Sequence, residues 1–434
     1  MHCTRRQFLK AGAGSCVAMG IPLVLQGCGG DEEESRGSVQ ATVHTVLGDG
    51  PSDLHEMAKR AAGALGFCDN GELSGKTVFI KPNLVSFGTG FPVDPLTGEW
   101  TKAEILVGVA EQCLEAGAAR VTIGDGAQGL EWDWNSLVFF EGTTLLGGEN
   151  LQEATRSLAL RFPRQEIELL CLNAVNEWEH IPSSSDHEMM RSGLKVAKSF
   201  YEADHVISVP VLKTHTFSDL TCSMKNYVGV TPAIPPYGLY GNVLQRTELH
   251  RAYANATSAG IEEAGIAACF TDIVKWRKKA GKQDYAIVDC SIGIEGDGPI
   301  IMTGGKPIDM KERCPAGKYF LMASDDLPAA DATAARVMGM DAGRVKQLCM
   351  ARGLGLGATR NIRVVGDATL DRIRIPDFVA AEQVPEWEPS ATVPPCCEGR
   401  AEKGPSHAAN VIGSFGLAAG SIHLYRSLSG REKP

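Results

Sequence analysis

Apolar runs rich in β-branched residues alternate with stretches of helical periodicity from about residue 40 onward. Residues 41–47 (ATVHTVL) predict a strand, residues 52–66 an amphipathic helix ending at Gly66, and residues 76–85 (KTVFIKPNLV) a second strand. The order repeats with a helix over 103–117 and a strand over 119–126. Strand, helix and strand in this rhythm predict an α/β fold with a mostly parallel, doubly wound sheet.

The remaining pattern defines the expected domain organisation. Residues 127–165, rich in tryptophan and glycine, break the rhythm, so we expect an insertion or lid there. We expect the α/β domain to span 39–375 and a proline-rich C-terminal extension to span 376–434. Further predicted elements are a long helical region over 246–280 and strands over 205–213, 285–290, 318–324 and 361–366.

The first residues carry the features of an export signal. Arg5 and Arg6 precede a short apolar stretch that contains three glycines and a proline, typical of a twin-arginine signal peptide over residues 1–27. The segment Leu25-Gln26-Gly27-Cys28 resembles a lipobox, which predicts cleavage before Cys28 and lipidation of its thiol. An acidic tether over 28–38 would then link the lipid to the fold. We therefore expect a membrane-anchored lipoprotein, exported by the twin-arginine machinery to the periplasm or cell surface.

The charge balance restricts the partners. The formal net charge is −10, and removal of Arg5, Arg6 and Lys10 with the signal lowers it to −13. Such an anionic body excludes nucleic acid as an expected partner, and membrane attachment should depend on the acyl chains at Cys28. Because the twin-arginine route carries folded proteins, a cofactor can be acquired before export.

Cysteine spacing argues against an iron–sulfur cluster. Of thirteen cysteines, ten remain beyond Cys28, and no C-x-x-C spacing occurs among them. Ferredoxin-type clusters and zinc ribbons need closely spaced thiolates, so neither is expected. Cys396 and Cys397 are the only close pair, and some of the ten can form disulfides whose pairing the sequence leaves open.

Polar residues follow the predicted strands where a doubly wound sheet forms its ligand crevice. Lys81 and Asn83 flank Pro82, whose ring stiffens the turn. Lys213 and His215 leave another strand, and the pair Lys225-Asn226 follows ten residues later. Ammonium and amide donors suit a carboxylate or phosphate, so these segments predict an anion site. The alternative is a purely structural role for both residues. Lys81 would then only end its strand, and His215 would be a polar histidine whose hydrogen bonds are satisfied within the fold.

Carboxylates follow a third strand. Asp289 ends the run YAIVDC, and the glycine-rich loop after it presents Glu295 and Asp297. This density of carboxylates suits a hard divalent cation or general acid–base chemistry. A polar loop with glycines needed only for turning is the alternative. Asp326 and Asp331 are expected near the site, with helix capping as a strong competing interpretation.

The ordered segments KPNLV, LKTH, MKNYVG, IVDCSIGIEGDGP and SDDLPAADATAARVMG resemble the family known as domain of unknown function 362, over roughly residues 75–345. Many relatives carry ferredoxin-like cysteine clusters, which this chain lacks, so the resemblance implies no iron–sulfur role. What it implies is a site, made of Lys81, Asn83, Lys213, His215, Lys225, Asn226, Asp289, Glu295 and Asp297. The lysine and histidine arrangement is also distantly similar to nickel-pincer lactate racemases, as an analogy of fold alone.

Together these features favour a metal-assisted enzyme that acts on a small anionic substrate. In this interpretation Lys213 and Lys225 hold the anion, and His215 acts as acid, base or ligand. Lys81, Asn83 and Asn226 complete substrate binding, and the carboxylates hold a divalent metal. The alternatives are a non-catalytic lipoprotein that binds a solute or cofactor, and a partner of an iron–sulfur redox protein.

Overall fold

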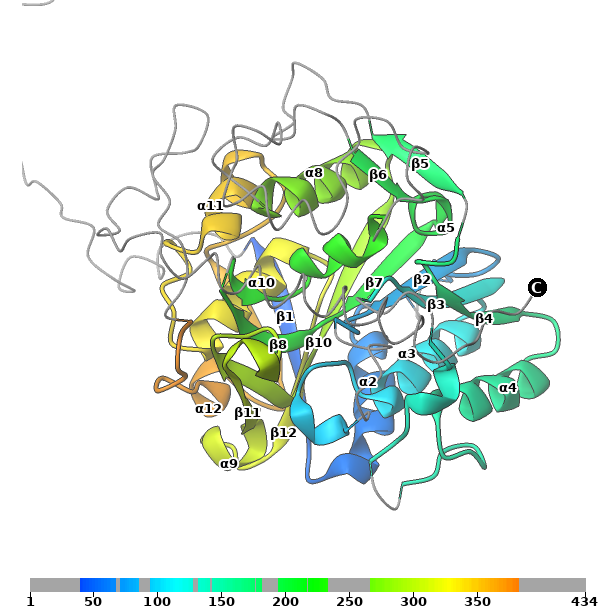
Figure 1. Ribbon diagram of the computed structural model, residues 1–434, viewed down its shortest axis with the longest axis horizontal. Helices are drawn as coiled ribbons and strands as arrows, with labels where there is room; N and C mark the ends of the chain where they lie inside the picture. The colour runs from blue at the N-terminus through cyan, green and yellow to red at the C-terminus, as the bar shows by residue number, and fades with distance from the viewer. Residues whose placement is uncertain are drawn as a thin grey trace, which may run out of the picture. The chain divides into compact units, whose positions relative to one another are not determined.

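An 11-stranded, mostly parallel sheet forms the centre of the described structure (Figure 1). The structure is a computed structural model and describes residues 40–67, 71–85, 94–127, 132–140, 143–175, 177–181, 194–216, 218–232 and 266–381. The chain divides into two units, Met1–Ser38 and Val39–Pro434, and every described residue belongs to the second. The predicted Cys28 lipidation site and the twin arginines therefore lie outside the described residues.

The main path of the sheet has the order β13-β1-β12-β10-β7-β2-β3-β4, and all neighbours in it are parallel except the two pairs that involve β12. Its strands are β1 (Ala41–Gly48), β2 (Thr77–Pro82), β3 (Arg120–Asp125), β4 (Glu166–Cys171), β7 (His205–Val209), β10 (Gln283–Gly296), β12 (Tyr319–Ser324) and β13 (Ile362–Gly366). Beside this path lie β8 (Val211–His215), β9 (Asp219–Thr221) and β11 (Gly305–Asp309), and a separate hairpin joins β5 (Trp178–Ile181) to β6 (Leu194–Ala197).

Helices cover both faces of the sheet, as the alternation of strand residues requires (Figure 1). In β2, Val78 and Ile80 pack in one hydrophobic cluster with α2 (Leu54–Gly63), α3 (Ala103–Glu115) and α4 (Leu151–Arg161). Phe79 between them packs in the other cluster, with α5 (Lys198–Glu202), α8 (Ile266–Lys279), α10 (Leu327–Val337) and α11 (Lys346–Gly353). Successive side chains of a strand point to opposite faces, so this segregation confirms the predicted doubly wound α/β fold.

The shorter helices complete the connections. They are α9 (Met310–Arg313), α12 (Leu370–Ile373) and the 3₁₀ turns η2 (Pro51–Asp53), η3 (Pro95–Thr97), η4 (Trp134–Ser136), η5 (Lys225–Val230) and η6 (Ile301–Thr303). No helix in the part of the chain that the structure describes is long and apolar enough to cross a membrane.

The connection between β3 and β4, predicted to be an insertion, contains a regular crossover helix. In α4, Leu151, Ala154 and Leu158 are buried at helical spacing, and Asn150 caps the helix by accepting a hydrogen bond from the Glu153 amide. The helix joins two parallel strands, as a βαβ unit requires. Many polar residues between these apolar positions concealed the pattern in the sequence.

The long strand β10 determines where the site lies. Its first half pairs with β7 through residues 283–286, and its second half pairs with β8 at Asp289 and Ile294. Pro210 separates β7 from β8 because it has no amide hydrogen to donate, while its carbonyl accepts from the Asp289 amide at 2.8 Å. The strands β7 and β8 therefore follow one another along β10, and β8 extends beyond the carboxyl end of β7.

Candidate functional site

Four buried lysines gather at the carboxyl ends of β2 and β7, and we call Lys81, Lys102, Lys213 and Lys225 the lysine cluster. The Lys81 ammonium lies 2.5 Å from the Asp125 carboxylate at the end of the neighbouring strand β3. It also donates to the Pro82 carbonyl at 2.6 Å and to Asn226 Oδ1 at 3.3 Å. Because both Lys81 and Asp125 are buried, this pair is a neutral unit shielded from solvent.

Lys213 contacts the same group of residues from β8. Its ammonium donates to Asn83 Oδ1 at 2.5 Å and to the Glu99 backbone carbonyl at 2.7 Å. Asn83 in turn donates to Asn226 Oδ1 at 3.4 Å. Asn83 is only half-buried, whereas Lys213 is fully buried, so the group approaches solvent at Asn83.

The turn η5 presents Lys225 and Asn226. The Asn226 amide donates to the Lys81 carbonyl at 2.7 Å and to Ser208 Oγ on β7 at 3.1 Å. Gly229 of the same turn lies directly against the ion pair of β2 and β3, because a Cβ at this position would come within 2.3 Å of Asp125 Oδ1. Only glycine allows η5 to approach so closely, and this contact fixes the turn over the end of β2.

A second buried ion pair lies at the start of α3 and includes another lysine of the cluster. The Lys102 ammonium lies 3.4 Å from Asp289 Oδ2 and donates to the Ile292 carbonyl at 3.0 Å. Asp289 also accepts from the Ser291 amide at 3.0 Å and from its hydroxyl at 2.5 Å. Both charged side chains have no exposed area, so the pair is a structural anchor between the start of α3 and β10.

The other two lysines of the cluster have no carboxylate partner within the described part of the chain. Burial lowers the pKa of Lys213 to about 7, although the negative charge of Glu99 raises it, and the charges of Lys225 and Lys102 lower it further. Burial also lowers the pKa of Lys225 to about 7; the charge that Cys269 can carry raises it, and Lys81 lowers it. A buried ammonium without a counter-ion is costly, so each amine favours either loss of its proton or an added anion.

A hydrogen-bond chain connects the turn η5 to α10. Asp331, which is fully buried, accepts from the Ser223 amide at 2.7 Å and from the Ser223 hydroxyl. The Ser223 carbonyl accepts from Ser208 Oγ at 2.9 Å, and Ser208 contacts Asn226. Burial raises the pKa of Asp331 to about 6, while its hydrogen bonds with Ser223 lower it. Asp331 thus orients the segment that carries Lys225 and is not itself in contact with the lysine cluster.

His215 lies on the same face of β8 as Lys213, because the two residues are two positions apart in one strand. The paired strand β9 places Asp219 opposite His215 and Thr221 opposite Lys213. His215 is buried. The predicted role of His215 as acid or base stays a prediction.

The predicted metal ligands do not come together. Asp289 and Glu295 are six residues apart on one strand, which separates their Cα atoms by roughly 20 Å. Asp289 is paired with Lys102, whereas Glu295 lies 3.5 Å from Arg313 and accepts from the Val379 amide at 3.1 Å. The hydrogen bond described for Asp297 is one that its backbone carbonyl accepts from Thr303.

This geometry corrects the proposed trio of carboxylates. Within the described ranges, no three histidine, cysteine, aspartate or glutamate side chains group so as to hold a metal ion. Asp289 was predicted to lie at the end of a strand and Glu295 and Asp297 in the loop after it, but β10 continues through Gly296 and carries Glu295 away from Asp289. These residues therefore do not fit a shared divalent metal.

Of the two aspartates near α10, one is a helix cap. Asp326 accepts from the Ala329 amide at 2.9 Å and from the Ala358 amide at 2.9 Å, as the capping interpretation expects. Asp331, five residues later, faces Ser223 instead. The two aspartates therefore have different structural roles: Asp326 caps α10, and Asp331 binds Ser223.

The sequence interpretation missed Asp125, the acidic partner of Lys81, and Lys102 itself. Asp125 ends the predicted strand VTIGD and satisfies the same strand-end rule that selected Lys81. Lys102 stands just before a predicted helix, a position that usually holds a capping residue and gives no functional signal. Glu99 acts on Lys213 through its backbone carbonyl, which accepts a hydrogen bond, and through its negative charge, which opposes the lowering of the Lys213 pKa by burial; it was not singled out from the sequence.

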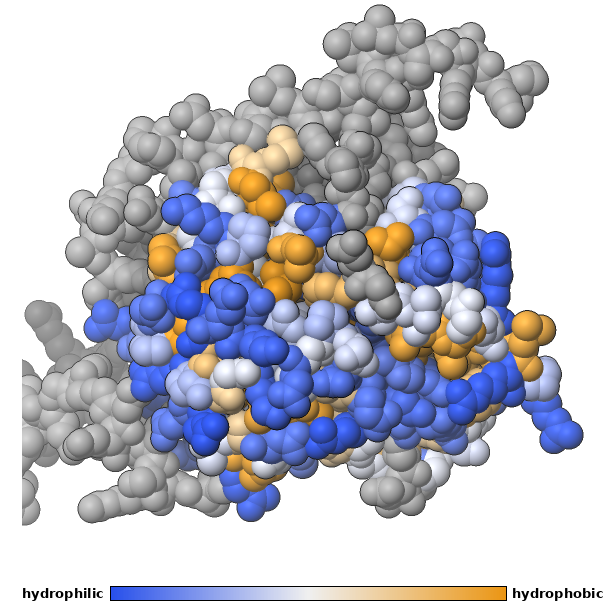
Figure 2. Space-filling model, turned by 90° about the horizontal axis from the view of Figure 1, so that it is seen from below, coloured by the Kyte–Doolittle hydropathy of each residue, from blue (hydrophilic) through white to orange (hydrophobic). Residues whose placement is uncertain are grey.

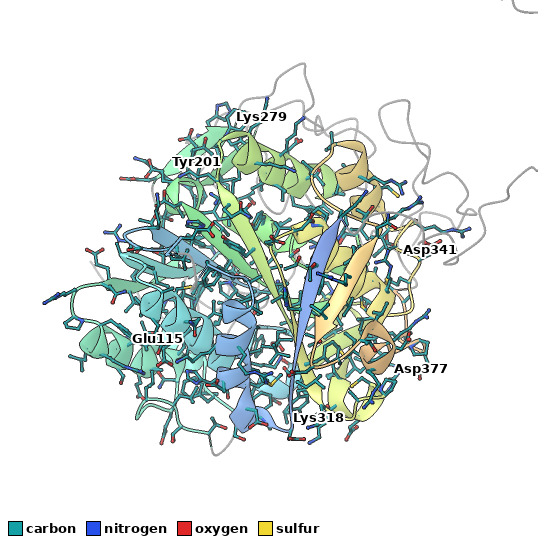
Figure 3. The ribbon with its side chains drawn as sticks, turned by 180° about the vertical axis from the view of Figure 1, so that it is seen from behind. Glu115, Tyr201, Lys279, Lys318, Asp341 and Asp377 are labelled. Atoms are coloured by element: carbon teal, nitrogen blue, oxygen red, sulfur yellow. The ribbon has the colours of Figure 1, made fainter. Side chains whose placement is uncertain are left out.

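The surface carries polar and charged residues that are exposed, unlike the buried lysines of the cluster. Figure 2 shows one face on which hydrophilic residues cover large areas and apolar residues form smaller groups. Figure 3 labels Lys279, Lys318, Asp341 and Asp377, which lie at the outer edges of the ribbon in this view. The lysine cluster is thus chemically distinct from surface lysines such as Lys279, which is exposed.

Comparison with protein families assigns the chain. Residues 78–336 match the family described as Domain of unknown function (DUF362). The chain belongs to this family. The matched range contains the whole lysine cluster, and it agrees with the range predicted from the ordered motifs. Comparison with curated proteins finds no match.

Solved structures give weak similarities. The lactate racemase apoprotein from Thermoanaerobacterium thermosaccharolyticum has 14% sequence identity and a TM-score of 0.33, over 69% of this chain and 57% of that protein. A Thermotoga maritima protein solved by structural genomics has 11% identity and a TM-score of 0.33, over 65% of this chain and 57% of that protein. The chain therefore spans little more than half the length of either protein.

Proposed function

We propose that the lysine cluster binds a small anion, carboxylate or phosphate, and that the protein is an enzyme acting on it. One observation carries the proposal: Lys213 and Lys225 lack a carboxylate partner in the described structure, while Lys81 and Lys102 are neutralised by Asp125 and Asp289. An anion would supply the missing counter-charge. The Asn83 amide nitrogen, beside the same lysines, donates one hydrogen to Asn226 Oδ1 and has a second hydrogen to offer the anion.

Anion binding should weaken as pH rises above neutrality. Burial sets the pKa of Lys213 and Lys225 at about 7 in the empty site, so above that pH an anion must recruit protons in order to bind. Between pH 6 and 9 we expect the affinity to fall about 100-fold for each lysine that must be charged. Calorimetric titration of the wild-type protein with sulfate or acetate, whose charges stay constant over this range, measures the effect.

The ligand-free protein should show the opposite trend. Because the folded-state pKa of these lysines lies below the ordinary value of 10.5, the unfolded chain binds their protons more strongly. Their contribution to the free energy of unfolding therefore increases from about pH 7 to 10.5 and is lost as pH falls through 7. An anion affinity that does not change between pH 6 and 9 would contradict the proposed site.

We also infer that the protein is exported and anchored through lipid on Cys28. The twin arginines, the short apolar stretch and the lipobox-like segment support this inference. Cys349 is disulfide-bonded, which suits an oxidising compartment.

Replacing Cys28 with serine tests the anchor. If the thiol carries the lipid, Cys28→Ser protein should move from the membrane fraction to the soluble fraction after export, because serine cannot form the thioether. Immunoblotting of fractionated cells measures the distribution, and Cys16→Ser, within the signal, is the matched control. Unchanged membrane association of Cys28→Ser protein would refute the anchor.

A further inference from the structure

Lys225 differs from the other members of the lysine cluster. Two of them are paired with carboxylates, and Lys213 donates to two oxygen atoms at 2.5 and 2.7 Å. The Lys225 ammonium forms no hydrogen bond or ion pair within the part of the chain that the structure describes, although the residue is only 7% exposed. In that part of the structure, no group accepts a hydrogen bond from the Lys225 ammonium, and no donor occupies the nitrogen lone pair of the neutral amine.

The surroundings of Lys225 favour the neutral amine. Burial lowers its pKa to about 7; the charge that Cys269 can carry opposes this shift, and the positive charge of Lys81 adds to it. Desolvation and a neighbouring cation are the two ways in which proteins activate a lysine amine as a nucleophile. Exposed lysines, by contrast, remain protonated at neutral pH.

The turn that carries Lys225 is held firmly. Its neighbour Asn226 contacts the Lys81 carbonyl and Ser208, and Asp331 accepts two hydrogen bonds from Ser223 just before the turn. A nucleophile requires such a fixed position relative to the group that binds its substrate. Lys213 lies close enough to Lys225 for the two charges to influence each other.

We propose that Lys225 attacks a carbonyl group of the bound anion and forms an imine with it. This inference rests on the proposed anion site and names its ligand class: an aldehyde or ketone that carries a carboxylate or a phosphate. Lys213 would hold the anionic group, and Lys225 would face the carbonyl carbon.

The step balances without an oxidant or reductant. The Nζ lone pair forms a bond to the carbonyl carbon, and the carbonyl oxygen takes up a proton to give a carbinolamine. The carbon–oxygen bond then breaks, and the oxygen leaves as water with the two hydrogens that the amine supplied. The products are one carbon–nitrogen double bond on Lys225 and one water molecule.

Reductive trapping tests the proposal. Wild-type protein is incubated at pH 7 with glyoxylate or with glycolaldehyde phosphate and cyanoborohydride, and its peptides are mapped by mass spectrometry. We expect a carboxymethyl or phosphoethyl group on Lys225, formed at least about tenfold faster than on exposed Lys279, because more of the Lys225 amine is unprotonated. Which probe reacts faster distinguishes a carboxylate ligand from a phosphate ligand.

Controls connect the adduct to the site. Sulfate, which has no carbonyl group, should slow labelling of Lys225 and leave labelling of Lys279 unchanged. The Lys225→Met variant should lose the adduct while keeping a cooperative unfolding transition. Because mapping of the wild-type protein identifies the labelled residue directly, the result does not depend on whether this variant folds.

The outcomes separate the two proposals. Labelling on Lys213, or equal labelling of Lys225 and the exposed lysines, overturns the imine proposal. Sulfate binding without an adduct leaves the anion site in place and rejects Lys225 as the nucleophile. Absence of both sulfate binding and the adduct rejects the site as well.

Discussion

Replacing Lys213 with methionine is expected to remove at least about two-thirds of the stabilisation that sulfate or acetate gives the wild-type protein. An anion at 100 times its Kd should add about 2.7 kcal/mol to the free energy of unfolding. Removing one buried charge that faces the anion costs about 2–5 kcal/mol of binding, so the same concentration should stabilise the variant by about 0.9 kcal/mol at most. The rise in melting temperature on anion addition measures the difference.

The methionine variant should still fold. Methionine has nearly the volume of lysine, and its substitution removes a fully buried amine whose charging is costly. Two acceptors, Asn83 Oδ1 and the Glu99 carbonyl, lose their donor, which costs about 1–3 kcal/mol for each one left unpaired. Lys279→Met, on the exposed end of α8, is the matched control and should respond to anions as the wild type does. An equal response from Lys213→Met would reject Lys213 as an anion ligand.

The second large effect concerns stability. Replacing Lys102 with methionine should lower the free energy of unfolding by about 3–5 kcal/mol, because it leaves the Asp289 carboxylate buried without its cation. Adding Asp289→Asn should restore much of the loss, since the amide oxygen still accepts from Ser291 but carries no charge. Urea unfolding of the single and double variants measures this coupling.

The comparison of the single and double variants also tests whether Asp289 is a structural partner of Lys102 or a metal ligand. If Asp289 is a structural partner of Lys102, the effects of the two substitutions are strongly non-additive. If Asp289 instead binds a metal, Asp289→Asn alone should lower the metal content of the purified protein and Lys102→Met should not. Additive losses of stability would contradict the ion pair.

Two strand-end arguments made from the sequence had opposite outcomes. Lys81 lies near the end of β2, and Lys213 lies in β8, which follows β7, the neighbour of β2. The structure brings Lys81 to Asn226 and Lys213 to Asn83, and these two amides contact each other. Asp289 was expected to end its strand and Glu295 to lie in the loop after it, yet β10 continues through Gly296. The strands β8 and β11 pair with this extension, and the sequence gives no sign of these long-range partners.

Local chemistry in the sequence determined the α/β fold, the family and the positions of the lysines, because hydrophobic period, turn residues and strand ends act over a few neighbouring residues. Which charges are paired was decided only by tertiary structure. Asp125 meets Lys81 because β3 lies beside β2, and Lys102 meets Asp289 because the start of α3 lies over β10. That Lys225 has no ion-pair partner among the residues the structure describes is visible only when all these neighbours are in place, since burial and ion pairing depend on residues far apart in the chain.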